Sequence, residues 1–314
     1  MTRTVLVTGA RGKTGREVVA QLAERGDTVV RGGSSQSPQS PRSSQSPRSS
    51  QSPRSSQSPR SSQSPRSSQS PRSPRSPREP TTIPFDWRDR STWPEAVDGV
   101  DAIYLARPDV QDSAELVTRL IAAAPRAHIV LVSEQGAERV AAGGWVRQVE
   151  DAVTGNASRW TILRPSWFQQ VLTDPRYFLD AIRRERVISL PTGGSPIAWV
   201  DTRDIAAVAV QAIADPVTHH AEAYTVTGPE AVTTTHIAAN ISAVIGAEVT
   251  ASVPPLSAAV AGADPWLADV VSDMFGRVHD GTFATVGDTV EKVTGRSPRT
   301  IEKFIAEHAD LWRG

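Results

Sequence analysis

A glycine-rich turn near the start of the chain limits the folds open to it more than any other feature. The apolar run Val5–Val7 leads into Thr8–Arg16, which reads TGARGKTGR, and a helical pattern of apolar residues begins at Val18. The three glycines, spaced G-x-x-G-x-x-G, allow a tight turn and a close approach of a ligand to the backbone. Free N–H groups and the positive dipole at a helix start suit a phosphate. The sequence therefore predicts a strand–turn–helix unit that binds a dinucleotide, and the alternative is the same turn without a phosphate.

A low-complexity repeat interrupts the chain soon after this unit. From Ser34 to Arg78 a Pro-Arg-Ser-Ser-Gln-Ser motif recurs every six residues, and proline is its only apolar residue. Such a segment buries too little surface to offset its conformational entropy, so we expect a disordered insert in a surface loop. One interpretation is a tandem repeat that the loop tolerates. The other is a functional arm that binds an acidic partner or RNA, or is phosphorylated at its Ser-Pro sites.

The repeat conceals the charge of the rest of the chain. The 314 residues balance 34 basic against 34 acidic side chains, but eight of the arginines lie in residues 34–78, which hold no acid. The remaining 26 basic and 34 acidic residues form an acidic body, which argues against nucleic acid as the main ligand. The chain has no cysteine, and its six histidines lack ligand spacing, so we expect no metal site.

No stretch of the sequence is suited to a membrane. No apolar run approaches the ~18 residues of a membrane span, and the first residues lack the apolar core of a signal peptide. We therefore expect a cytoplasmic protein that makes no contact with a membrane. The oligomeric partner, if there is one, is not indicated by the sequence.

Short apolar runs alternate with helical patterns through the first half of the chain. Strands are expected at 5–7, 28–31, 83–85, 100–106, 128–133 and 160–165, and helices at 112–124 and 144–153. This alternation predicts an α/β fold with a doubly wound, parallel Rossmann-type sheet. Ligands of such sheets lie beyond the carboxyl ends of the strands.

The pattern becomes mixed after Pro165. Helices are expected at 174–186, 204–214, 235–245 and most of 265–312, with short strands at 187–190, 197–200 and 224–228. We therefore predict a dinucleotide-binding domain over 1–165, with 34–79 as its insert, completed by parts of 195–230. Residues 166–194 and 231–314 are predicted to form a smaller, mostly helical lobe on the substrate side.

Six segments then identify a family. They occur in order along the chain: Thr8–Arg16, Phe85–Trp87, Arg164–Phe168, Val200–Ala206, Tyr224–Glu230 and Thr294–Arg299. As a set they resemble the NmrA-like, atypical short-chain dehydrogenase/reductase family, and above all its ergot-alkaloid-biosynthesis-like NAD(P)H-dependent reductases. The resemblance covers nearly the whole chain except 34–80. Because the family includes quinone, imine and azo reductases as well as non-catalytic redox sensors, the motifs do not name a substrate.

The resemblance implies a set of site residues. For the cofactor these are Gly9, Gly12, Lys13, Thr14, Gly15, Arg16, Arg31, Asp86, Ser133 and Pro165. The glycines would wrap the pyrophosphate, Asp86 would lie on the adenine side, and Ser133 would lie beside the nicotinamide. Asp86 is alternatively a turn or cap residue. Trp167 and Phe168 would line the substrate pocket, or else pack in the core.

The chain departs from the family at the point that distinguishes NADP from NAD. An NAD site places an acidic residue at the end of the second strand, on the ribose hydroxyls. Here Arg31 is followed by Gly-Gly-Ser-Ser, with no acid. The absence of an acid favours NADPH, with NADH possible, although the second arginine that relatives carry near Ser34 or Ser35 is missing. Arg31, or an arginine of the repeat such as Arg42, would substitute for it.

A second departure concerns catalysis. The Tyr-x-x-x-Lys pair of short-chain dehydrogenases is absent, since the expected helix reads GWVRQVED over residues 144–151. Without a positioned proton donor, simple ketone reduction is disfavoured. Quinones and iminium ions accept hydride readily and can take their proton from water. We therefore expect an NAD(P)H-dependent oxidoreductase acting on a small conjugated acceptor, with no catalytic side chain identified, or alternatively a regulator that binds the dinucleotide without turnover.

Overall fold

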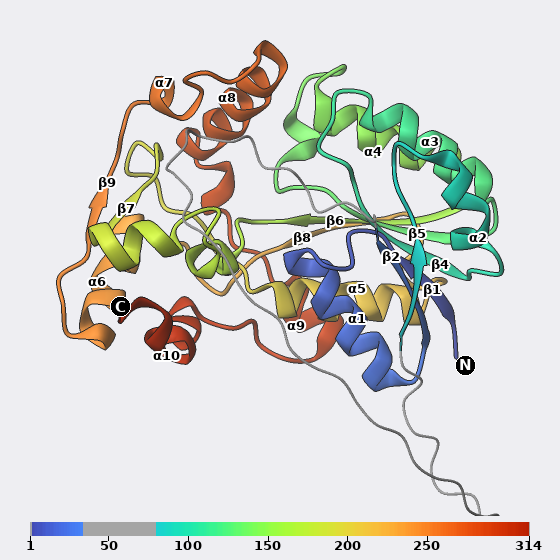
Figure 1. Cartoon of the computed structure of the whole chain (residues 1–314), viewed down its shortest axis with the longest axis horizontal. Coiled ribbons are helices and arrows are strands. Elements are labelled where there is room, and N and C mark those ends of the chain that lie inside the picture. Colours follow the sequence, from blue (N-terminus) through green and yellow to red (C-terminus); the bar gives the residue numbers. More distant parts are fainter. Residues whose placement is uncertain (1, 34–79, 314) are drawn as a thin grey trace, which may run out of the picture.

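A computed structural model describes residues 2–33 and 80–313 and shows a central sheet covered by helices on both faces (Figure 1). Its seven strands are all parallel and lie in the order β3-β2-β1-β4-β5-β6-β8. Their bounds are β1 (Thr4–Val7), β2 (Thr28–Gly33), β3 (Thr81–Pro84), β4 (Ala102–Ala106), β5 (His128–Val132), β6 (Arg159–Pro165) and β8 (Glu222–Val226). The strand order reverses between β1 and β4, so the end of β1 lies at the crevice where such sheets bind ligands.

Successive side chains along each strand point to opposite faces of the sheet. Val5 and Val7 of β1 pack with helices α1 (Lys13–Arg25), α5 (Thr202–Ala214) and α9 (Thr289–Thr294). Leu6 points to the other face, towards α2 (Trp93–Val97), α3 (Ser113–Ala123) and α4 (Trp145–Asn156). Both layers are visible in Figure 1. Because the central strands β1, β4 and β5 are covered on both faces, their residues are apolar at nearly every position.

The C-terminal lobe has its own core. Its elements are β7 (Val187–Ser189), α6 (Thr234–Ile245), β9 (Thr250–Ser252), α7 (Leu256–Ala259), α8 (Pro265–His279) and α10 (Ile301–Trp312). Strands β7 and β9 pair in parallel as a small second sheet. Large buried side chains, among them Trp199, Phe283, Phe304 and Trp312, fill the space between these elements. Short single-turn segments η1 (Arg90–Thr92), η2 (Ala137–Arg139), η3 (Gln169–Thr173), η4 (Ala181–Glu185) and η5 (Thr282–Ala284) complete the described chain.

The fold class predicted from the sequence is confirmed, and two local predictions are wrong. Residues 197–200 form no strand, because Ile197 and Val200 make single bridges to Val232 and Phe168. Of the helix expected over 174–186, only residues 179–185 are helical: the backbone turns at 175–178, and two α-helical residues then lead into the π-helical turn η4. The predicted boundaries of the two domains remain a prediction, and the predicted disorder of the repeat falls outside the described residues.

Helix α5 begins two residues earlier than expected, and Asp201 caps it. The Asp201 carboxylate accepts a hydrogen bond from the backbone N–H of Arg203 at 2.8 Å. Asp204 has a different role, since its carboxylate pairs with Arg299 of the loop before α10. The element therefore joins the central sheet to the C-terminal lobe.

Candidate cofactor and acceptor site

The glycine turn lies at the carboxyl end of β1 and leads directly into α1. Thr8 ties the end of β1 to β4, because its hydroxyl accepts a hydrogen bond from the N–H of Ala106 at 2.9 Å. The Gly12 N–H then donates to the Gly9 carbonyl at 2.8 Å, which closes the turn. In the described structure the helix starts at Gly12 without a side-chain cap and has no acidic residue in its first turn. Its N-terminus is thus suited to an anion.

Two of the three glycines are required by the local geometry. Gly9 has φ +64°, in the left-handed region that side chains disfavour. A Cβ on Gly15 would lie 2.2 Å from the Gly9 carbonyl oxygen, so any larger residue would push the helix away from the turn. The turn fits a pyrophosphate that approaches the backbone closely.

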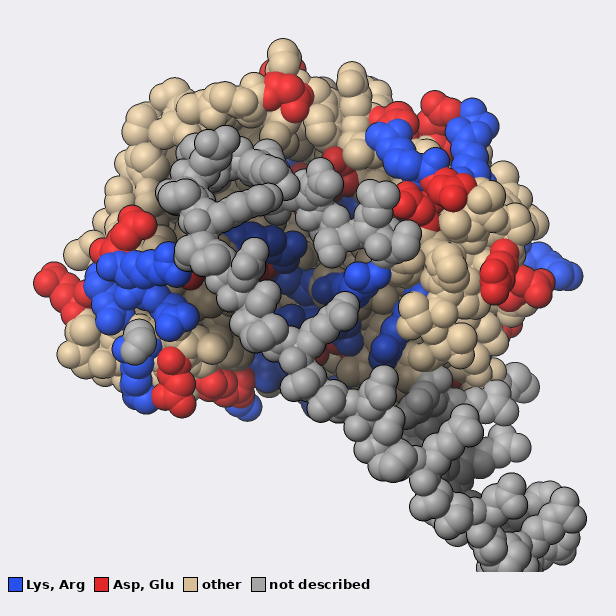
Figure 2. Space-filling model, in the orientation of Figure 1, with Lys and Arg blue, Asp and Glu red and all other residues tan. Residues whose placement is uncertain are grey.

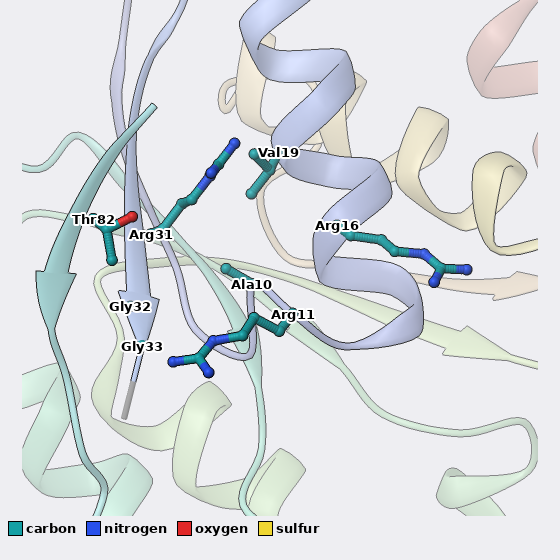
Figure 3. Close-up of a pocket in the computed structure, with 8 residues that line it drawn as sticks. All are labelled: Ala10, Arg11, Arg16, Val19, Arg31, Gly32, Gly33 and Thr82. Carbon is teal, nitrogen blue, oxygen red and sulfur yellow. The ribbon is translucent and has the colours of Figure 1, made fainter. Parts of the chain in front are cut away.

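A cavity of about 380 Å³ opens beside the turn, between α1 and the end of β2 (Figure 3). Three arginines line it together with small residues: Arg11, Arg16 and Arg31. Figure 3 shows the Arg11 guanidinium near Gly33 at the end of β2, whereas the Arg31 side chain points towards Val19 of α1 and Arg16 extends away from both. The Arg16 Nε lies 3.3 Å from Glu17 Oε1, on the exposed surface. Arg11 therefore lies closest to the end of β2, and Arg31 lines the same cavity on the side of α1.

Arg11 is a candidate that the sequence analysis missed. A Cβ on Gly33 would lie only 3.1 Å from Arg11 Nη2, so the guanidinium covers the last residue of β2. This is the position at which Rossmann folds distinguish the two dinucleotides. The signal in the sequence was a basic residue inside the glycine turn together with two glycines at the end of β2. Arg42, the other substitute considered, lies outside the described residues.

Lys13 and Thr14 occupy different surroundings within the first turn of α1. Thr14 is buried, while the Lys13 ammonium lies 2.6 Å from Asp174 Oδ2 and 4.2 Å from the centre of the Tyr177 ring. Burial lowers the pKa of Lys13, although Asp174 opposes that effect. A segment of the C-terminal lobe is thereby held against the glycine turn. Basic side chains also gather in the hollow at the middle of this face of the molecule (Figure 2).

Asp86 does not lie within a strand. It follows β3 by two residues, and its carboxylate accepts a hydrogen bond from the Arg88 N–H at 2.8 Å. Its carbonyl also accepts from the indole N–H of Trp93 at 2.8 Å. This arrangement supports the alternative of a turn residue, and Asp89 supplies the cap of η1.

The ends of β5 and β6 present two buried hydroxyl groups. Ser133 is 5% exposed and Ser166 is 2% exposed, and among the described residues neither Oγ has a hydrogen-bond partner. Pro165, also buried, accepts a hydrogen bond from the Gln135 N–H and holds the two strand ends together. Unpartnered buried hydroxyls are costly unless a ligand satisfies them. They fit the carboxamide of a nicotinamide.

The helix that carries the Tyr-x-x-x-Lys pair in other short-chain dehydrogenases has a structural role here. Its buried residues are Val146, Val149, Glu150, Ala152 and Val153, of which Val149, Ala152 and Val153 pack in the core on this face of the sheet. Glu150 receives two hydrogen bonds from the Arg164 guanidinium, at 3.0 and 2.7 Å. An ion pair between α4 and β6 thus lies on this buried face of the helix.

Trp167 packs in the core of the C-terminal lobe. Its ring centre lies 5.7 Å from that of Trp199 and 5.6 Å from that of Phe275, both edge-to-face. Phe168 packs against the other core, beneath the sheet. Both side chains are only partly buried, so their role in a pocket stays a prediction.

An ion-pair chain that the sequence analysis missed joins the two halves of the molecule. Glu134, directly after Ser133, pairs with Arg107 at 2.8 Å and with Arg277 of α8. Burial would raise the pKa of Glu134, but the two guanidinium groups hold it below its ordinary value. Arg277 also donates to the carbonyl of Gln135 at 2.8 Å. The residues lie far apart in the sequence, so spacing gave no signal.

Comparisons with known proteins place the chain in a family. It is 35% identical over 235 residues to the NAD(P)H azoreductase of Xenophilus azovorans, which covers 71% of this chain and 81% of that protein. The structure also resembles that of NmrA, a negative transcriptional regulator in complex with NADP, with a TM-score of 0.68 at 13% identity and coverage of 99% and 96%. The chain belongs to the NmrA-like atypical short-chain dehydrogenase/reductase family.

Another member of this NmrA-like family matches almost end to end. The (4-alkanoyl-5-oxo-2,5-dihydrofuran-3-yl)methyl phosphate reductase of Streptomyces griseus is 29% identical, covering 98% of this chain and 99% of that protein. No known protein-family model matches the chain. Among residues 2–33 and 80–313, no helix is both long and apolar enough to cross a bilayer. The family predicted from the sequence motifs is confirmed.

Proposed function

We propose that this protein is an NAD(P)H-dependent oxidoreductase that prefers NADPH and reduces a small conjugated acceptor, of quinone, imine or similar type. The observation that carries the proposal is the glycine turn, in which a Cβ on Gly15 would collide with the Gly9 carbonyl while Arg11 lies beside the last residue of β2 and Arg31 lines the same cavity. The names of the two relatives, both reductases, support the reaction class.

Each part of the site has a role in this proposal. The backbone of the turn and Lys13 hold the pyrophosphate, and Arg11 and Arg31 hold the ribose 2′-phosphate. The hydroxyls of Ser133 and Ser166 orient the nicotinamide by donating or accepting one hydrogen bond each. The bound cofactor supplies the hydride.

The acceptor class follows from what α4 lacks. The buried residues of α4 are Val146, Val149, the paired Glu150, Ala152 and Val153, and none of them donates a proton to a developing alkoxide. Acceptors whose reduced form takes its proton from water do not need such a group. The protein then contributes by holding the nicotinamide and the acceptor in the geometry for hydride transfer, and not by acid–base chemistry.

Calorimetric titration with NADPH, NADP⁺, NADH and NAD⁺ tests the cofactor part. We expect NADPH to bind more tightly than NADH. Arg11→Ala and Arg31→Ala should each weaken NADPH binding by about 10- to 100-fold, the value of a charge-assisted hydrogen bond, and leave NADH binding unchanged. Arg119→Ala is the matched control, because Arg119 is paired with Glu115 on the exposed face of α3. Absence of binding by all four dinucleotides would refute the proposal.

A second pair of variants tests the turn itself. Gly15→Ala should abolish binding of every dinucleotide because of the collision with Gly9. Gly155→Ala, in α4, meets no atom within 4 Å and should bind normally. Oxidation of NADPH is then measured with a panel of quinones, imines and azo compounds. Tight binding without turnover of any acceptor would favour the non-catalytic regulator.

A further inference from the structure

A second cavity lies between α4 and α8, away from the arginines beside β2. It has a volume of about 400 Å³ and is lined by Trp145 and Val146 of α4, by Trp266, Asp269 and Asp273 of α8, and by Glu134. The two helices face each other at the top of the view in Figure 1. Because Glu134 directly follows Ser133, the cavity opens next to the end of β5, where the nicotinamide is expected.

Two indole rings form one part of the wall. The ring centres of Trp145 and Trp266 lie 5.6 Å apart at an interplanar angle of 81°. Trp145 is fixed in place, because its Nε1–H donates to the Val110 carbonyl at 2.8 Å and the Arg107 guanidinium lies 4.7 Å from its ring centre. The cavity therefore offers aromatic surface that is already oriented.

The charges at this wall have one sign. Every charged residue that lines the cavity in the described chain is acidic: Glu134, Asp269 and Asp273. Glu134 is neutralised by two arginines behind it, and Asp273 lies 3.1 Å from Arg277. Asp269, exposed on α8, has no ion-pair partner among the described residues. One carboxylate thus remains uncompensated beside the two rings.

We propose that this cavity binds the acceptor of the reaction and selects planar aromatic molecules that carry a positive charge. Indole faces attract cations through their quadrupole, and the Asp269 carboxylate adds a Coulombic attraction. An anionic aromatic meets repulsion from the same carboxylate. The identification of the occupant as the acceptor rests on the proposed reductase function, whereas the charge preference of the cavity does not.

Three bicyclic probes of similar size test the charge preference: N-methylquinolinium as the cation, quinoline as the neutral molecule and 1-naphthoate as the anion. Each is titrated by calorimetry at pH 7.5 into the full-length protein without added dinucleotide. We expect the cation to bind about tenfold more tightly than the anion, as for one partly screened charge pair. Asp269→Asn should reduce that ratio about threefold. Glu24→Gln removes the same charge from α1, on the other side of the sheet, and should leave the ratio unchanged.

A further variant tests the aromatic wall. Trp266→Phe should retain part of the affinity for all three probes, and Trp266→Ala should lose about tenfold for each. Equal binding of cation and anion, or an unchanged ratio in Asp269→Asn, would overturn the proposal even if the Trp266 variants proved unstable.

Inhibition kinetics then separate this inference from the proposed function. N-Methylquinolinium should compete with the acceptor and not with NADPH. If NADPH is oxidised but the cation preference is absent, the inference is wrong and the reductase function stands. If the cation preference is present but no dinucleotide binds, the reductase function is wrong, and so is the identification of the occupant as an acceptor.

Discussion

His128, at the start of β5, shows how one buried residue is held in a single protonation state. The Thr161 hydroxyl donates to the His219 carbonyl at 2.6 Å, so it accepts a hydrogen bond from His128 Nε2–H at 2.9 Å. The Nδ1 atom is then left unprotonated, and in the described part of the chain it has no partner. Burial, followed by repulsion from His220, Arg159, Arg3 and His219, lowers the pKa of His128 from 6.5 to about 4.

This pKa predicts a stability that depends on pH. Between about pH 6.5 and pH 4 the unfolded chain binds a proton at residue 128 that the folded chain does not, so the free energy of unfolding falls as the pH falls. The contribution is at most about 3 kcal/mol. His128→Gln retains a donor towards Thr161 but does not titrate. Urea unfolding at pH 7.5, 5.5 and 4.5 should therefore show a flatter pH dependence in the variant, and identical slopes would contradict the assignment.

Site residues were predictable where the physical requirement is local. Gly9 and Gly15 follow from a tight turn between a strand and a helix, and both requirements are visible within nine residues. Arg11 and Glu134 were missed because their roles depend on neighbours far along the chain, at Gly33 and Arg277. Asp86 follows the end of β3 by two residues, and its place on the adenine side stays a prediction.

At the scale of elements, the segment after β6 departs from its sequence pattern. A helix was expected over 174–186, but Asp174 uses its own carboxylate to bind the Arg176 N–H at 2.9 Å, and Pro175 cannot continue a helical ladder. The segment ends at Arg186 in the left-handed region, with φ 56°. Its irregular path lets Asp174 reach Lys13 at the glycine turn, a contact that helical periodicity could not indicate.

The contact between Asp174 and Lys13 leads to a prediction on cofactor affinity. Hydrogen bonds from Arg176, and then from Lys13, hold the pKa of Asp174 far below its usual range, so the carboxylate is charged at neutral pH and the tie weakens only in strong acid. Asp174→Asn should raise NADPH affinity about three- to tenfold, because Lys13 then faces the pyrophosphate without a competing carboxylate. It should also lower the free energy of unfolding by about 1–3 kcal/mol. Calorimetry and urea unfolding measure the two effects.

A control for this prediction lies on the same segment. Asp180 is half-exposed and lies 3.8 Å from Arg184, so Asp180→Asn should change neither quantity. A decrease of NADPH affinity in Asp174→Asn would show instead that the carboxylate positions Lys13 for binding.

At the scale of the whole molecule, the order of the strands could not be read from periodicity, although the six strands up to Pro165 and the parallel direction of the sheet could. Strand β8 joins the sheet beside β6 only after the chain has passed through η3, η4, β7 and α5. Residues 197–200 look like a strand because they are apolar, yet they are buried between the two cores and pair through single bridges. Burial alone produces the same pattern as a strand, so sequence could not separate the two.

The topology also limits how far the repeat can be shortened. Strands β2 and β3 are adjacent and parallel, with Gly33 opposite Pro84. The connection must therefore run from the carboxyl end of β2 back to the amino end of β3. Parallel neighbours need a crossover of roughly a dozen residues or more. Deleting residues 35–78 would leave three residues between Gly33 and Thr81, and we expect β3 to detach and the arginine-lined cavity to lose Thr82 as a wall.

A graded deletion therefore separates the repeat sequence from the length that it provides. A chain that keeps about 15 residues between the strands should fold, bind NADPH as the full chain does, and gain about 1 kcal/mol in unfolding free energy from the shorter loop. The chain with three connecting residues should unfold at lower urea concentration and bind NADPH more weakly. Thermal and urea unfolding with calorimetry measure this. Loss of NADPH binding in the chain that keeps about 15 connecting residues would instead show that the repeat itself takes part in cofactor binding, because the connection would still be long enough for the fold.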